Sequence, residues 1–317
     1  MSASWLTVLS VSWRSAEWLR DLFANMLALA EQPDGLRFLV ADNTNGADPD
    51  LRRLDFPRLE IVPVDVGGQI MSMAHACGLN ALWERVETPF ALIVDPDVAV
   101  LRPGWDSALQ EVFATRDVVA VGAPYPSWKL GKYHDFPSPI FACWRSEALR
   151  ALTPDWRPYG RTACRRLLDF ALRQTFWLPR AFDRFVLRLP RRQFRTARWV
   201  EQGVGVVSKD TGWEIAQRAG RQGWRAALFD VVRDPATLDG MAAEALPPYR
   251  RLADEFELYA WQNRPFLTHR NPTFTRLAFN LWTHRNILIY QNRQDQAAKT
   301  ALWRELVAAV RSTLPDR

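Results

Sequence analysis

A strand, a helix and a second strand at the start of the chain limit its fold more than any other feature. Residues 5–12 are rich in β-forming side chains, residues 16–31 have the apolar spacing of an amphipathic helix, and residues 37–41 form another apolar run. This order predicts a βαβ unit, in which the two strands are parallel and the connection is right-handed. The sequence therefore predicts an α/β protein with a mostly parallel sheet.

Two further strands are predicted downstream. Residues 59–64 and 90–94 are apolar, and a helix from about residue 71 to residue 84 lies between them. The run at 90–94 is continuously apolar, as expected of a parallel strand that is buried on both faces. Open α/β sheets bind ligands outside the carboxyl ends of their strands. The residues that follow these strands are therefore the first candidates for a site.

Asp95, Pro96 and Asp97 directly follow the strand at 90–94. Pro96 has a fixed φ and no N–H group, so it ends the strand and leaves a carboxylate on each side. Two neighbouring carboxylates repel each other unless a proton or a cation lies between them. A hard divalent cation that also binds substrate phosphates would satisfy both. The alternative is that these residues only begin a surface turn, in which both types are common.

Polar residues or glycines also follow the first three strands. Ser12 and Trp13 follow the first, Asp42 follows the second, and Asp65 and Gly67 follow the third. The carboxyl ends of parallel strands lie at one edge of a sheet, so these residues are expected near Asp95 and Asp97. Gly67 and the glycine after it would let the backbone approach a ligand closely, or would simply form the connection to the next helix.

The order of these strand ends resembles that of the family 2 glycosyltransferases of GT-A fold, a Rossmann-like α/β fold. The resemblance covers roughly residues 5–230 and rests on four segments: 8–15, 40–43, 65–67 and 92–97. It implies that a nucleotide-diphospho-sugar donor binds across the first three strands, with the segment of Asp65 and Gly67 helping to hold it. One departure is Asp65, where the family more often has Asn.

The resemblance also implies roles for single residues. Ser12 and Trp13 would line the nucleoside pocket, Asp42 would point toward the base, and Asp95 would face the donor ribose or sugar. Asp97 would bind a Mg²⁺ or Mn²⁺ ion. These roles predict a metal-dependent transferase whose donor lies along the carboxyl edge of the sheet.

Two residues late in the chain match further family features. Asp210 lies just before a predicted helix, where inverting members carry their catalytic base, and Lys209 occupies a position where a second acid is often found. Asp210 could instead be a helix N-cap, worth about 1 kcal/mol. His269 is the best match for a late histidine that binds the metal, and its alternative is a purely structural role.

Residues 124–137 are aromatic and interrupted by prolines, so they predict an irregular loop. Aromatic faces suit sugar rings, and the resemblance places this region on the acceptor side. The candidates for acceptor contact are Trp128, Tyr133, His134 and Asp135. The alternative is that the aromatic side chains of the loop pack together as a small satellite cluster.

Residues 156–198 contain twelve arginines and two aspartates, interleaved with leucine and phenylalanine. This stretch, the basic insert at about 156–200, interrupts the family pattern, which resumes near residue 204. One interpretation is a membrane-surface contact, attracted by anionic lipids and held by apolar burial. Another is a basic subdomain packed on the core. Nucleic-acid binding is a third, but no recognisable RNA-binding module is present.

The predicted organisation is a GT-A catalytic domain over 1–235, which contains the basic insert, and a helical C-terminal extension over 236–317, with helices near 273–291 and 294–313. The net charge of +6 suits anionic partners. The three cysteines lack metal-site spacing. No signal peptide or long apolar run is found, so we expect a cytoplasmic protein that could also contact the inner face of the membrane.

Two rival classes remain. A nucleotidyltransferase would carry a glycine-rich basic loop after its first strand, and residues 12–15 lack one. A non-catalytic protein would use the basic insert to bind lipid or RNA, and it would need no divalent cation. The expected enzyme, in contrast, moves a sugar with inversion to an acceptor hydroxyl, in glycan, polysaccharide or glycoconjugate synthesis.

Overall fold

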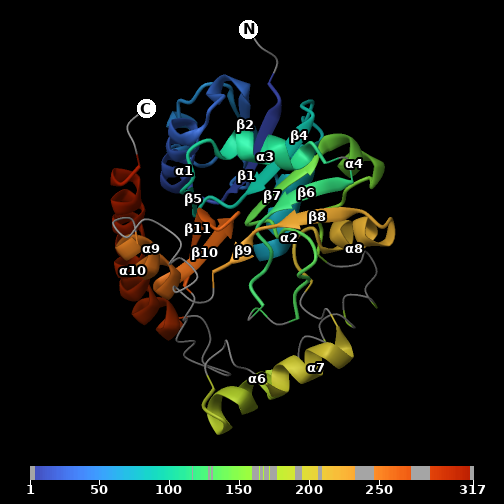
Figure 1. The fold of residues 1–317 in the computed structure, drawn as a ribbon, viewed down its shortest axis with the longest axis vertical. Coiled ribbons are helices and arrows are strands. Elements are labelled where there is room, and N and C mark those ends of the chain that lie inside the picture. The colour runs from blue at the N-terminus through green and yellow to red at the C-terminus, as the bar shows by residue number, and fades with distance from the viewer. Residues whose placement is uncertain are drawn as a thin grey trace.

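The computed structural model describes residues 4–115, 117–127, 129, 131–158, 164, 167, 171, 177–189, 195–205, 209–232, 246–272 and 286–314. Within these residues the chain forms two β-sheets with helices packed against them (Figure 1). The first sheet has seven strands in the order β3-β2-β1-β4-β7-β6-β8, and the second has four in the order β5-β11-β10-β9. The two sheets meet at the residues that follow β4.

The first sheet is mostly parallel. Strands β1, β2, β3 and β4 run in one direction, and β6 pairs in parallel with β8. Strand β7 is antiparallel to both of its neighbours. The bounds of these strands are β1 Leu6–Ser12, β2 Leu36–Asp42, β3 Leu59–Pro63, β4 Phe90–Val94, β6 Val118–Gly122, β7 Phe141–Arg145 and β8 Arg225–Leu228. The predicted α/β class with a mostly parallel sheet is confirmed.

Helices cover both faces of this sheet because its strands alternate apolar residues between the faces. In β1, Leu6 and Val8 belong to one core, whereas Leu9 and Val11 belong to the other. The first core is completed by α1 (Ala16–Leu29) and α3 (Trp105–Phe113), and the second by α2 (Met71–Trp83), α4 (Ser146–Ala151) and α8 (Trp213–Arg221). Two short 3₁₀ helices, η1 (Pro33–Gly35) and η2 (Leu51–Arg53), lie in the connections on either side of β2.

The second sheet is antiparallel and comes largely from the C-terminal part of the chain. Its strands are β5 (Val98–Val100), β9 (Asp230–Val231), β10 (Phe256–Trp261) and β11 (Arg264–Pro272). Helices α9 (Leu246–Glu255) and α10 (Asn286–Ser312) pack on it through a third apolar core. The region after residue 235 was predicted to be mainly helical; α9 and α10 are helices, but β10 and β11 were not predicted. The part of the predicted helix at 273–285 lies outside the described residues.

A tight hairpin explains why β10 and β11 were not predicted. The two residues between them, Gln262 and Asn263, have φ angles of 53° and 59°. Positive φ at both central residues is the mark of a type I′ turn, which is usually encoded by Asn-Gly or Asp-Gly. Gln-Asn lacks the glycine, so residues 262 and 263 carry no strong turn signal.

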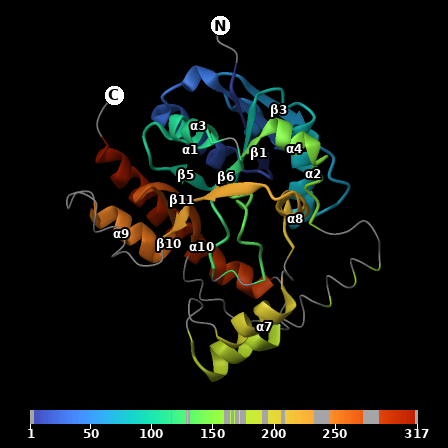
Figure 2. The ribbon, with the colours of Figure 1, turned by 45° about the vertical axis from the view of Figure 1, so that its right-hand side comes forward.

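In the basic insert, the described helices lie apart from both sheets (Figure 2), whereas Trp156 at its start is buried in the second apolar core. The described elements of the insert are α6 (Trp177–Ala181), a π-helical turn η3 (Phe182–Val186) and α7 (Thr196–Val204). The buried carboxylate of Asp183 accepts hydrogen bonds from the N–H groups of Thr196 and Ala197, at 3.0 and 2.8 Å. Asp183 therefore ties η3 to the start of α7. Among the described residues, no helix has the length and apolar content needed to cross a membrane.

Candidate metal and donor site

Asp95 and Asp97 lie where the chain passes from the first sheet to the second. β4 ends at Val94 and β5 begins at Val98, so the two carboxylates occupy the turn between them. β5 pairs with β11 in a register that sets Val98 opposite His269. This pairing brings His269 to Asp97 from far along the chain, with 3.2 Å between His269 Nε2 and Asp97 Oδ1.

Asp95, Asp97 and His269 form a group that could hold a metal ion, called the metal group below. Each offers one ligand atom, and these atoms lie within 4.8 Å of one another. Two carboxylates with one imidazole suit Mn²⁺ and, through the oxygens, Mg²⁺. The side chains of Asp95 and Asp97 are 28% and 24% exposed, so an ion and its remaining ligands can reach them. The residues present therefore fit the predicted cofactor.

The two carboxylates of the metal group differ in electrostatic environment. Burial raises the pKa of Asp95, and the charge of Asp97 adds to this, although His75 partly offsets it. Burial also acts to raise the pKa of Asp97, but the charge and hydrogen bond of His269 outweigh it and hold this pKa well below its usual range. A cation between the two carboxylates would relieve the repulsion that raises the pKa of Asp95.

Glu257 of β10 holds the other side of the His269 ring. Its Oε2 lies 3.1 Å from His269 Nδ1 and accepts a hydrogen bond of 3.1 Å from the hydroxyl of Tyr259. Lys129 forms an ion pair with the same carboxylate at 2.8 Å. Burial opposes ionisation of Glu257, but Lys129 and His269 lower its pKa. A carboxylate on the second nitrogen fixes the ring orientation of a metal-binding histidine.

His269 itself responds to both neighbouring carboxylates. Burial acts to lower its pKa, yet Asp97 and Glu257 together raise it to about 9. His269 also has a structural role, as the alternative interpretation expects, because its ring links the carboxylates of Asp97 and Glu257. Its Nε2 atom nevertheless points at the carboxylate that the sequence predicts as a metal ligand.

Asp210 is surrounded by donors from α2, from loop 124–137 and from the adjacent Thr211. Its Oδ1 accepts hydrogen bonds from the hydroxyl of Ser72 at 2.6 Å and from the N–H of Thr211 at 2.9 Å. Its Oδ2 accepts one from the hydroxyl of Tyr125 at 3.0 Å and forms an ion pair with Lys132. Burial acts to raise the pKa of Asp210, but Lys132 and the hydrogen bonds lower it to about 2.

The helix-cap interpretation of Asp210 is wrong. Helix α8 begins at Trp213, and Gly212 occupies its N-cap position with a left-handed φ of 79°. The Asp210 carboxylate makes its contacts elsewhere, with Ser72, Tyr125 and Lys132. Its contribution is therefore to a polar cluster at the carboxyl edge of the sheet rather than to the end of a helix.

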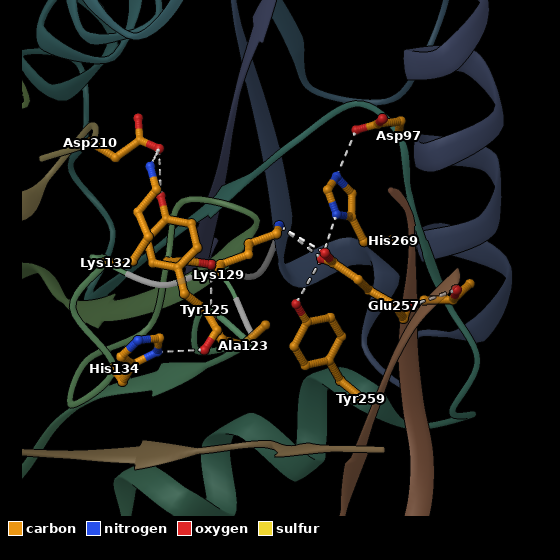
Figure 3. Close-up of polar contacts among 12 residues, drawn as sticks. Asp97, Ala123, Tyr125, Lys129, Lys132, His134, Asp210, Glu257, Tyr259 and His269 are labelled. Atoms are coloured by element: carbon orange, nitrogen blue, oxygen red, sulfur yellow. Dashed lines mark hydrogen bonds and ion pairs between the residues drawn. The ribbon is translucent and has the colours of Figure 1, made fainter. Parts of the chain in front are cut away.

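Asp210 and the metal group lie close enough for their charges to interact. The charge of Asp210 raises the pKa of Asp95, together with burial and Asp97. Figure 3 shows Asp210 with Lys132 and Tyr125 on one side, and Asp97 with His269 and Glu257 on the other. Acids from β4–β5 and from the approach to α8, with a histidine of β11, thus face one region of the molecule.

The predicted donor residues differ in what they can offer. Ser12 is fully buried and its Oγ accepts the N–H of Ser15 at 3.1 Å. Trp13, at the end of β1, is 62% exposed, so its ring is open to a ligand. Asp65 is exposed and its Oδ1 accepts the N–H of Gly67 at 2.8 Å.

Asp42 is almost fully buried at the end of β2. Its carboxylate accepts hydrogen bonds from the N–H and hydroxyl of Thr44, at 2.9 and 2.6 Å, and from the N–H of Gly46, at 2.9 Å. These bonds shape the turn after β2. Asp42 therefore organises the loop that borders the predicted base pocket, and a direct contact of its carboxylate with a base stays a prediction.

The acceptor-side candidates also differ in their exposure and contacts. Trp128 lies outside the described residues. Tyr133 is buried and packs edge-on against Tyr125 at 5.2 Å, which matches the alternative of a packed cluster. His134 Nδ1 lies 2.9 Å from the carbonyl oxygen of Tyr125, and the hydrogen bond with Glu201 raises its pKa against the effect of burial. Asp135 is exposed.

Sequence reasoning did not single out five residues of this region: Ser72, His75, Lys129, Lys132 and Glu257. Ser72 and His75 are three positions apart on α2, so they share a helix face, and His75 Nε2 lies 3.7 Å from Asp95 Oδ1. Glu257 is a charged residue within the otherwise apolar strand β10, and this pattern was the one sequence signal that could have indicated its role. The two lysines lie in an irregular loop without any periodic pattern.

A cavity of about 760 Å³ lies elsewhere, against α3 and the turn between β10 and β11. Among the residues that line it are Glu31, Arg102, Tyr249 and Gln262. It contains none of the predicted site residues and no described cluster of acids with a histidine. The metal group is therefore the stronger candidate for chemistry.

No protein-family model matches the chain, and no curated protein matches it. The structure is similar to the mannosyltransferase PcManGT from Pyrobaculum calidifontis in complex with GDP-Man and Mn²⁺, over 48% of this chain and 47% of that one, at 17% identity and a TM-score of 0.37. It is similar to S. aureus TarS 1–349 in complex with UDP over 48% and 49%, at 15% identity and a TM-score of 0.34.

Mouse xyloside xylosyltransferase 1, in its apo form, is similar over 47% of this chain and 69% of that one, at 13% identity and a TM-score of 0.31. The chain thus spans about half the length of the first two structures. Glycosyltransferase structures are among those that this fold resembles. The function proposed below rests on the residues of this chain.

Proposed function

We propose that this protein is an inverting, metal-dependent glycosyltransferase of the family 2 type, which moves a sugar from a nucleotide-diphospho-sugar to an acceptor hydroxyl. One observation carries the proposal. Asp95, Asp97 and His269 come together as a group that can bind a cation, and Asp210 lies within electrostatic reach of it at the carboxyl edge of a mostly parallel sheet. Open α/β sheets bind their ligands at this edge.

Asp97 and His269, with Asp95 beside them, would hold Mg²⁺ or Mn²⁺. The bound ion supplies Lewis-acid stabilisation for the negative charge that develops on the leaving diphosphate. Glu257 keeps the His269 ring in place through Nδ1, which leaves Nε2 directed at Asp97. Arg270, whose guanidinium lies 3.2 Å from Asp97 Oδ2, fixes the other oxygen of that carboxylate.

Asp210 is the proposed general base. It would accept the proton of the acceptor hydroxyl as the hydroxyl oxygen bonds to the anomeric carbon and the bond from that carbon to the diphosphate breaks. Attack from the face opposite the leaving group inverts the anomeric centre. A positioned base contributes about 10²- to 10⁴-fold to the rate. Tyr125 and Ser72 orient the carboxylate through their hydroxyl groups.

The donor would extend from the metal group toward the ends of β1, β2 and β3. The exposed ring of Trp13 offers a stacking surface for the base, and the turn shaped by Asp42 borders it. Ser12, Asp65 and Gly67 belong to the same edge and are assigned to donor binding. On the acceptor side, the candidates are four residues of loop 124–137: Trp128, Tyr133, His134 and Asp135.

We also propose that the basic insert contacts an anionic membrane surface, which would place the enzyme at the inner, cytoplasmic face of a membrane, next to a glycan or lipid-linked acceptor. Apolar side chains are exposed on η3, including Phe182 at 45% and Phe185 at 54%. The exposed arginines Arg188 and Arg195 are close to them in sequence. Apolar burial combined with attraction to anionic lipid is the physical basis of such contacts.

The test of the proposed function is a panel of UDP, GDP, dTDP and CMP sugars, assayed with and without Mn²⁺ or Mg²⁺. Thermal stabilisation and slow donor hydrolysis by the full chain are expected with one nucleotide class, and only when the cation is present. A non-catalytic lipid- or RNA-binding protein would give neither signal. Nucleotidyl transfer from a nucleoside triphosphate, in place of sugar transfer, would contradict the proposal in favour of a nucleotidyltransferase.

A further inference from the structure

Loop 124–137 brings two lysines to the acids of the site. The chain has four lysines, and two of them, Lys129 and Lys132, lie three positions apart on this loop. Lys132 pairs with Asp210, and Lys129 pairs with Glu257 at 2.8 Å. Their side chains are 18% and 21% exposed, so both ammonium groups are largely withdrawn from water.

One of these lysines contacts the proposed base, and the other contacts the carboxylate that holds His269 of the metal group. Glu257 contacts His269 of the metal group, so a single carboxylate separates the Lys129 ammonium from that group. Lys132 lies on the other side, at the proposed base. Figure 3 shows Lys129 reaching from the loop of Lys132 and Tyr125 across to Glu257. Two cations thus flank the place where a metal-bound diphosphate would lie.

The contact of Lys132 with Asp210 conflicts with the chemistry proposed for Asp210. A carboxylate that already accepts bonds from an ammonium and two hydroxyls has little capacity to accept a further proton. The low pKa of Asp210 has the same cause, and a general base works best when its pKa is near the working pH. The contact that suits the resting protein must therefore be exchanged before transfer.

We propose that Lys132 and Lys129 bind the donor diphosphate, and that Lys132 leaves Asp210 when it does so, which frees the base only after the donor is bound. This inference rests on the proposed function and deepens it by naming the residues that recognise the diphosphate. A diphosphate brings at least two negative charges close to these ammonium groups, and lysine binds phosphate oxygens as a point charge. Lys132 then keeps Asp210 from accepting a proton in the free protein and binds the diphosphate once the donor is present.

The coupling explains why a loop, and not a rigid strand, carries the lysines. Exchange of one anionic partner for another requires the ammonium to move by a side-chain rotation or a small shift of the loop. Tyr125 remains on Asp210 through its hydroxyl, so the carboxylate keeps its orientation when Lys132 departs. An acceptor hydroxyl can then take the hydrogen-bonding position that Lys132 vacates on Oδ2.

The experiment is isothermal calorimetry of UDP, GDP and dTDP with Mn²⁺ on the full chain and on Lys132→Gln and Lys129→Gln. Loss of a charge-assisted hydrogen bond should weaken binding of the preferred nucleoside diphosphate by about 10- to 100-fold in each variant. Lys132→Arg, which keeps the charge, should recover most of the affinity. Lys299→Gln, which removes a lysine of α10 by the same substitution, should bind as the wild type does.

The outcomes separate the two proposals. If the wild type binds none of the three nucleoside diphosphates with Mn²⁺, the proposed function fails and the lysine assignment fails with it. If the wild type binds one of them and both glutamine variants bind it equally well, only the lysine assignment is contradicted. Affinity that falls in Lys132→Gln but is not restored by Lys132→Arg would also contradict it, because the effect would then come from the shape of the loop rather than from charge.

Discussion

The carboxyl edge of the first sheet and the basic insert both depart from the usual distribution, in which charged side chains are exposed and large apolar side chains are buried. At the edge, charged groups such as Asp97, Asp210 and Glu257 are withdrawn from water and paired with cations or His269. In the insert, Phe185 and Trp199 are exposed by 54% and 74%. Buried charge and exposed aromatic surface both cost stability or solubility. Each region is therefore better explained by a ligand than by folding.

The two regions also differ in how they are built. The edge is fixed by strand pairing, since the register of β5 with β11 brings His269 to Asp97. Among the described residues of the insert, hydrogen bonds to Asp183 join η3 to the start of α7. A contact joins the two regions, because Glu201 of α7 accepts the N–H of Gly131 in loop 124–137. Contact of the insert with a partner could thus reach the loop that carries Lys132.

The largest expected effect is at the edge. Replacement of Asp210 by Asn keeps the shape of the side chain, but it turns one accepting oxygen into an NH₂ group and removes the proton acceptor. Transfer should fall by about 10²- to 10⁴-fold, while Mn²⁺-dependent binding of the donor is retained. Steady-state kinetics and calorimetry on the same preparation measure the two quantities. Asp34→Asn, which makes the same change at an exposed carboxylate of η1, is the matched control.

Unchanged transfer in Asp210→Asn would remove this residue from the mechanism. Loss of donor binding together with transfer would give Asp210 a role in the donor site instead. Either result would contradict the assignment of the general base to the carboxyl edge, and with it the difference in role proposed between this edge and the basic insert.

A smaller effect is expected from the insert. The double variant Phe182→Ser, Phe185→Ser removes two exposed rings, each of which gains about 1.5–3 kcal/mol when it is fully buried. Flotation with vesicles that contain anionic phosphatidylserine should show binding weaker by about tenfold or more, with donor hydrolysis unchanged. Neutral phosphatidylcholine vesicles should bind the wild type weakly, since they lack the charge that attracts arginine.

Equal flotation of the double variant and the wild type would contradict the membrane contact. Salt-sensitive binding of RNA that is lost in arginine variants, without vesicle binding, would support the nucleic-acid interpretation in its place. In either case the chemistry proposed for the carboxyl edge is unaffected, because this experiment tests only the role of the basic insert.

Much of the fold was predictable because it follows from local patterns. The apolar run of β4, the amphipathic α1 and the turn residues after each strand define a βαβ sheet and its ligand edge. Asp97 and His269 were both predicted as metal ligands, and the structure brings them to 3.2 Å. The roles of the individual site residues stay predictions until they are tested by substitution.

The remainder depended on contacts that no local pattern encodes. The Gln262-Asn263 turn lacks the usual glycine, so β10 was missed and Glu257 with it. Lys132 contacts Asp210 across an irregular loop, and Ser72 contacts it from α2. Which of several polar residues meet at a site is decided by strand register and loop path, and a single sequence specifies neither directly.

The most direct measurement is an anomalous difference map from crystals of the full chain grown or soaked with Mn²⁺ and a nucleoside diphosphate. A single strong manganese peak is expected between Asp95, Asp97 and His269, with diphosphate oxygens completing its coordination. A peak at another location, or a bound nucleotide with no manganese at these three residues, would contradict the account.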